Sequence, residues 1–123
     1  MLYTASFYDP QDWKGRSYRI SRAHPRGLRT QWDTAPFLYP VRELLRAYRE
    51  GAVDFATLSR EYRQALDAAY DQLGQFQEWA LGLPSLGDFT LLCFEREGKP
   101  CHRRLAAGWL LERVPGLICG ELR

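Results

Sequence analysis

The chain has few cysteines and no long apolar run, and both absences exclude classes of protein. Three cysteines in 123 residues, an odd number, do not suggest a disulfide scaffold and favour a reducing compartment. No apolar run approaches the roughly 20 residues that a membrane helix needs. The start, MLYTASFYD, lacks the basic residues and long apolar core of a signal peptide. We therefore expect a soluble, cytoplasmic protein that does not contact a membrane.

Paired metal-binding elements are also missing from the sequence. It contains no Cys-x-x-Cys and no His-x-x-x-His pair, and strong zinc motifs depend on such pairs. The residues that could form a site without a pair are Cys93, Cys101, His102, His24 and Cys119. We expect neither a metal nor a cofactor.

What is present fits one small globular domain over residues 1–123. Apolar residues make up 46% of the chain and charged residues 26%, with a net charge of +2, all ordinary values. The hydrophobic pattern predicts strands at residues 2–8, 17–23, 89–94 and 117–119. It predicts helices at 40–50, at 55–82 with a break near Gly74, and from Pro100 until Pro115. The order strand, strand, helix, helix, strand, helix, strand indicates an α/β fold with a largely parallel sheet of about four strands.

The last third of the chain organises the candidate site. It is predicted to form a strand at 89–94, a charged loop, the helix that begins at Pro100 and the last strand. Cys101 and His102 therefore lie at the N-terminus of that helix. The apolar positions of this helix are Leu105, Ala106, Trp109 and Leu110, and its water-facing positions are Arg103, Arg104, Glu112 and Arg113. Trp109 is expected to be buried against the sheet.

Cys101 is the first chemical candidate. The positive end of the helix dipole and nearby arginines favour a thiolate, so Cys101 could be a nucleophile, with His102 or Glu95 handling protons. The alternative is that Cys101 packs as a small buried residue. Cys93 is interpreted as a core residue, because Lys99 stands where a phosphatase-type Cys-x5-Arg loop needs arginine.

The strongest electrostatic signal lies in residues 14–29, which hold six basic residues and no acidic one. If the second strand is parallel to the strand at 89–94, Arg22, Arg26 and Arg103 converge on one sheet edge. Open α/β sheets bind ligands at that edge, and arginines at a helix N-terminus suit an anion. The alternative is a solvated basic face with an ion pair to Glu95 or Glu97.

Three segments resemble a known family. They are CFEREGKPCHRRLAAGWLLE, which contains Cys-His-Arg; YRISRAHPRG, which contains Pro-Arg-Gly; and DFATLSREYRQALD. Each is similar to a segment of the domain of unknown function 488 family. The resemblance implies a small cytoplasmic α/β domain and no particular activity.

Three functional hypotheses follow from these observations. The first is a domain for a phosphate-bearing ligand, such as a nucleotide or a nucleic-acid end, bound by Arg22, Arg26 and Arg103. The second is a thiol-dependent enzyme that uses Cys101. The third is a protein-interaction module with exposed aromatic residues at Trp32, Phe37 and Tyr39.

Overall fold

A fully parallel sheet forms the centre of the structure, a computed structural model that describes residues 1–95 and 102–123. Within these ranges the strands are β1 (Leu2–Ser6), β2 (Arg16–Arg19), β3 (Asp33–Thr34), β4 (Phe89–Cys93) and β5 (Cys119–Leu122). They lie in the order β3-β2-β4-β1-β5, and every neighbouring pair is parallel. The predicted α/β fold with a largely parallel sheet is confirmed, and the second strand is parallel to the strand at 89–94.

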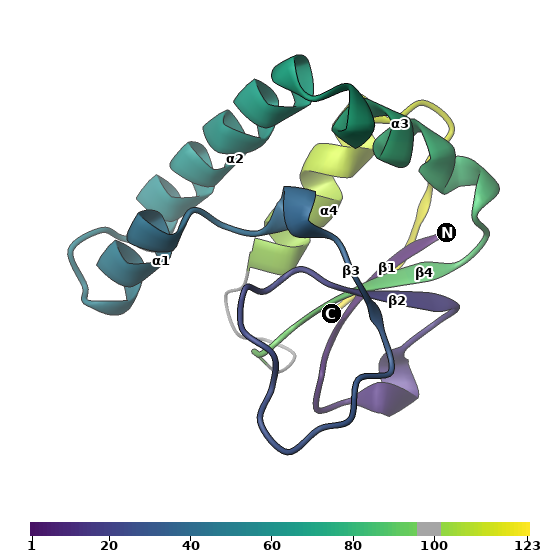
Figure 1. Cartoon of the computed structure of the whole chain (residues 1–123), viewed down its shortest axis with the longest axis horizontal. Coiled ribbons are helices and arrows are strands. Elements are labelled where there is room, and N and C mark those ends of the chain that lie inside the picture. The colour runs from purple at the N-terminus through teal and green to yellow at the C-terminus, as the bar shows by residue number, and fades with distance from the viewer. Residues whose placement is uncertain (96–101) are drawn as a thin grey trace.

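The helices all lie on one side of this sheet (Figure 1). They are α1 (Arg42–Arg49), α2 (Phe55–Gln72), α3 (Gly74–Gly82) and α4 (His102–Arg113). Short 3₁₀ turns, η1 (Pro10–Asp12), η2 (Pro36–Leu38) and η3 (Leu83–Ser85), occur in the connections.

Strand β4 is the middle strand of the sheet, and both of its faces are covered. All five of its residues are buried, as expected for a continuous apolar run inside a parallel sheet. Phe89, Leu91 and Cys93 belong to the main core with the helices. Leu92 points to the opposite face and packs in a second cluster with Phe7. The period-two alternation of a strand thus divides one apolar run between two cores.

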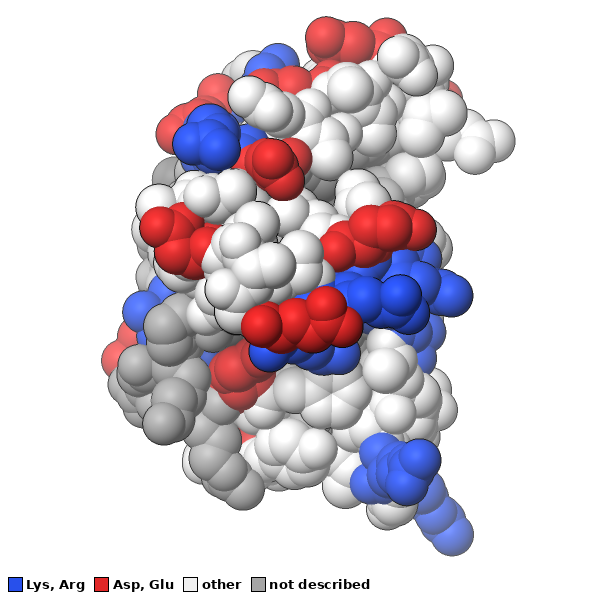
Figure 2. All heavy atoms as spheres, turned by 90° about the vertical axis from the view of Figure 1, so that its left-hand side faces the viewer, with Lys and Arg blue, Asp and Glu red and all other residues white. Residues whose placement is uncertain are grey.

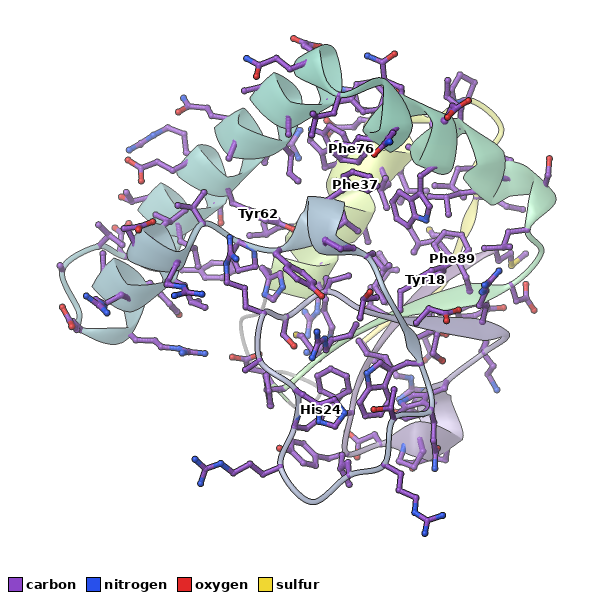
Figure 3. All side chains as sticks on the ribbon, in the orientation of Figure 1. Tyr18, His24, Phe37, Tyr62, Phe76 and Phe89 are labelled. Carbon is purple, nitrogen blue, oxygen red and sulfur yellow. The ribbon has the colours of Figure 1, made fainter. Side chains whose placement is uncertain are left out.

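Loops rather than helices cover the second face of the sheet. Trp32 is 8% exposed, and its ring lies 4.8 Å from that of Phe7 and 5.9 Å from that of Trp13. The ring of His24 lies 5.2 Å from Trp32, in the loop drawn on the far side of the sheet from the helices (Figure 3). The prediction that Trp32 is exposed is therefore wrong, because the aromatic residues of this face pack on one another. Phe37 and Tyr39 are half-buried.

Local signals explain where the helices begin and end. Asp54 is the N-cap of α2, since its Oδ1 accepts a hydrogen bond of 2.8 Å from the Thr57 amide. Gly51 follows α1 with φ of 77°, a conformation that glycine adopts without the strain of a Cβ. The long helical pattern divides at Leu73, whose extended backbone separates α2 from α3. The expected break near Gly74 is therefore confirmed.

Some predicted boundaries differ from those of the structure. The first two strands are shorter than predicted, because the turns begin at Ser6 and after Arg19. The last strand starts at Cys119, where the prediction ends it. The two-residue strand β3 lies in a segment that the sequence pattern indicates is a loop. Two residues are too few to show a period.

Trp109 is fully buried, as predicted, but its ring packs mainly on helices. It stacks on Phe76 of α3 at 5.4 Å and meets Tyr70 of α2 edge-on at 5.4 Å. Its Nε1 donates a hydrogen bond of 2.9 Å to Asp67 Oδ1. Trp109 therefore joins α4 to the helical layer above the sheet.

Candidate functional site

A cavity of about 410 Å³ opens at the carboxyl ends of β2 and β4. Its walls come from the segment after β2, from helix α1, from the end of β4 and from the first residue of α4. We call this cavity the arginine pocket. The charged and titratable residues in its described lining are Arg22, Arg42, Arg46, Arg49, Glu50, Glu95 and His102. Four arginines oppose two glutamates, Glu50 and Glu95, in its lining, so the pocket carries an excess of positive charge.

The three arginines of α1 reach the same cavity because of helical spacing. Residues 42, 46 and 49 stand four and three positions apart, which places them on one side of a helix. Leu44, on another side, is buried in the core and holds the helix in place. Figure 2 shows the face that carries α1, where Lys and Arg side chains form a continuous group beside Asp and Glu side chains.

The guanidinium groups of the pocket have few partners. None of Arg22, Arg42, Arg46 and Arg49 forms an ion pair with a carboxylate in the described part of the chain. Arg22 donates from Nε to the Pro40 carbonyl at 2.8 Å and lies over the ring of Tyr39. These contacts hold the Arg22 side chain at the pocket wall, and neither of them neutralises its charge.

His102 anchors the floor of the pocket to the sheet. It is 9% exposed, and its Nε2 lies 2.9 Å from the Ile20 carbonyl oxygen. A carbonyl only accepts, so Nε2 is the protonated nitrogen. Burial lowers the pKa of His102 below its ordinary value, which favours the neutral imidazole. The ring also meets Tyr62 edge-on at 5.7 Å, and Figure 3 shows Tyr62 reaching inward from α2.

Glu95 lies where β4 ends, beside His102 in the pocket wall. Its carboxylate counteracts the lowering of the His102 pKa through its negative charge, and its Oε2 lies 3.4 Å from Cys93 Sγ. Cys93 is 1% exposed, so its interpretation as a core residue is confirmed. The structure therefore brings together Glu95 and His102, two of the three catalytic candidates. Cys101, the third, lies outside the described residues.

Arg103 does not face water, and that prediction is wrong. The side chain is fully buried. Its Nε donates to the Arg123 carbonyl at 2.6 Å, and its Nη1 donates to the Glu95 carbonyl at 2.6 Å. A buried charge is tolerated only with such partners, and burial lowers the pKa of the guanidinium. Arg103 thus links α4 to the ends of β4 and β5.

The three arginines proposed from the sequence occupy different environments. Arg22 lines the pocket, whereas Arg26 and Arg103 are not among its described lining residues. Arg26 is exposed in the loop that follows β2, two residues beyond His24. The sequence analysis missed Arg42, Arg46 and Arg49. Their four-and-three spacing in the predicted helix at 40–50 was the signal that could have identified them.

No group of three or more histidine, cysteine, aspartate or glutamate side chains is placed to hold a metal ion in residues 1–95 and 102–123. Among the helices described, none has the length and apolar character to cross a membrane.

The fold and pocket define a class: a small parallel α/β domain with a basic cavity at the carboxyl edge of its sheet. A family model described as "DUF488-N3a: Active DUF488-N3 subclade" matches residues 2–114. The chain therefore belongs to the DUF488 family, as its Cys-His-Arg and Pro-Arg-Gly segments predict. No curated protein and no solved structure gives a significant match.

Proposed function

We propose that the protein binds a phosphate-bearing ligand, a nucleotide or a nucleic-acid end, in the arginine pocket. The observation that carries this proposal is the set of four arginines around one cavity without a carboxylate partner among the described residues. Like charges that share a cavity repel one another, and a bound anion relieves that repulsion. The position at the carboxyl edge of a parallel sheet supports the same proposal.

The arginines have distinct roles in this proposal. Arg22 and the α1 arginines donate to the phosphate oxygens, through charge-assisted hydrogen bonds worth about 1.5 to 3 kcal/mol each when shielded from water. All four are exposed, so screening by water and salt reduces each contribution. Arg103 acts indirectly, because it holds the Glu95 backbone through its bond to the carbonyl. Arg26 lies farther out and contributes at most long-range attraction.

The test compares matched charge reversals. Melting temperature is measured with and without inorganic phosphate or a nucleotide, at constant ionic strength, for the wild type, Arg46→Glu, Arg49→Glu and Arg26→Glu. We expect ligand-dependent stabilisation of the wild type and of Arg26→Glu, and its loss in the two pocket variants. The three variants make the same change of charge at exposed arginines, so a general electrostatic effect would alter all three equally. That result, or no shift for the wild type, would overturn the proposal.

Oligonucleotides distinguish the two ligand sources. A short single strand with a 5′-phosphate and the same strand without it are compared by fluorescence anisotropy. Stronger binding of the phosphorylated strand indicates a nucleic-acid end. Equal weak binding of both strands, together with stabilisation by the mononucleotide, indicates a small nucleotide ligand.

A second candidate function is a thiol-dependent reaction, with Cys101 as nucleophile and His102 or Glu95 handling protons. It is supported by the common wall formed by Glu95 and His102 and by the description of the matching subclade as active. Cys119, a free exposed cysteine, is an internal reference for its test. In the fully reduced protein, iodoacetamide near neutral pH should label Cys101 faster than Cys119, as measured by mass spectrometry of peptides. Equal rates, or labelling of Cys101 only after denaturation, would contradict this role.

A further inference from the structure

The arginine pocket continues into a second, smaller cavity of different character. This cavity, about 50 Å³ in volume, lies between α1 and α2, and we call it the apolar slot. Its hydrophobic walls are Pro40, Leu45, Tyr48, Phe55 and Leu58. It shares Pro40, Leu45, Arg49, Glu95 and His102 with the arginine pocket. One continuous site therefore has a cationic mouth and an apolar end.

The walls of the slot are held by core packing. Tyr48 and Phe55 lie with their ring centroids 5.9 Å apart, one on each side of the turn between the helices. Leu58 is 3% exposed, and Asp54 fixes the start of α2 through its N-cap bond. The slot is thus part of the folded helical layer.

We propose that the pocket and the slot together accept a second kind of ligand, an organic phosphate monoester with a compact apolar group next to the phosphate. This inference rests on the phosphate site of the proposed function and goes beyond it, because such a group is smaller than the sugar of a nucleotide. The phosphate binds Arg22, Arg46 and Arg49 in the mouth, and the ester substituent enters the slot past Leu45. A volume of about 50 Å³ is less than twice the roughly 30 Å³ that one water occupies in the liquid. The group that enters therefore has about two non-hydrogen atoms.

The apolar character and the small volume of the slot each predict which phosphate esters bind best. The hydrophobic walls of the slot favour an apolar substituent, and Arg49, Glu95 and His102 line both the slot and the arginine pocket. Each methylene moved from water into an apolar site strengthens binding about fourfold. The affinity should therefore rise from inorganic phosphate through methyl phosphate to ethyl phosphate, by roughly sixteenfold in total. It should fall for 2-hydroxyethyl phosphate and for phenyl phosphate, because both substituents have more than about two non-hydrogen atoms.

The test begins with the wild-type protein, so it does not depend on any variant folding. Dissociation constants for the five phosphates are measured by calorimetry at constant ionic strength and pH. A rising series that ends at ethyl phosphate supports the proposal. Equal affinities for inorganic, methyl and ethyl phosphate would overturn it and leave the proposed function intact. If no phosphate binds, the proposed function itself fails.

A variant that fills the slot provides the second arm. Leu58→Phe places a larger side chain in the wall of the slot, and Leu58 is not among the described lining residues of the arginine pocket. Leu81→Phe makes the same change at an exposed position of α3. We expect Leu58→Phe to bind inorganic phosphate like the wild type and to lose the preference for ethyl phosphate. Leu81→Phe should retain that preference. If Leu58→Phe binds inorganic phosphate and retains the full preference, the slot does not receive the substituent.

Discussion

Two adjacent arginines, Arg103 and Arg104, provide a sharp test of the structure because their burial is opposite. Arg103 is fully buried, whereas Arg104 is exposed. Replacing Arg103 by methionine keeps a long side chain but removes the donors to the Arg123 and Glu95 carbonyls, both at 2.6 Å. Hydrogen bonds that involve a charged group contribute about 1.5 to 3 kcal/mol each. The gross loss for two such bonds is about 3 to 6 kcal/mol.

Part of that loss is recovered, because methionine does not carry the cost of burying a charge. We therefore expect Arg103→Met to lower the free energy of unfolding by about 3 kcal/mol, and the melting temperature by about 10 °C or more. The measurement is urea denaturation followed by circular dichroism, with a thermal melt as a second observable.

Arg104→Met is the control, and its effect should stay within about 0.5 kcal/mol, as is usual for exposed positions. If the two variants have the same stability, Arg103 is not the buried link between α4 and the strand ends. The reasoning about Glu95 would then also fail, because that link holds its backbone in the pocket wall.

Three further predictions concern the core, a turn and the buried histidine. Trp109→Ala should cost about 3 to 5 kcal/mol of unfolding free energy, and a loss below about 1 kcal/mol would show that the helix face is misassigned. Gly15→Ala should destabilise far more than Gly27→Ala, measured by thermal melts. Both glycines have positive φ, but only at Gly15 would a Cβ meet backbone, 1.9 Å from the Asp88 oxygen. His102 has a lowered pKa in the folded state, so the unfolded state binds its proton more readily. Stability should fall as pH drops below about 6.5, and His102→Gln should show a weaker dependence in the same titration.

Much of the fold was predictable from local patterns. The apolar run that forms β4 and the N-cap aspartate of α2 are signals contained within a few residues. The stripe around Trp109 correctly identified the buried face of α4. The pattern failed for Arg103, because helical periodicity treats every arginine as a water-facing residue. Its burial depends on two backbone carbonyls, of Glu95 and Arg123, that the helix meets only in the folded state.

The candidate site was predicted in part. Its place at the edge of the sheet followed from the parallel pairing of the strands, and Arg22, Glu95 and His102 were all named from the sequence. The α1 arginines were not, since nothing local connects that helix with the end of β4.

By itself the sequence determined the composition of the core, the α/β class and the family, because apolar periodicity and short motifs are local properties. Only the tertiary structure decided that α1 supplies most of the cationic wall and that the apolar slot adjoins it. Helix α1 is separated from Glu95 and His102 by some fifty residues of chain. They line one cavity because β4 pairs with β2 and because α1 packs on α2, and such long-range packing has no counterpart in a local pattern.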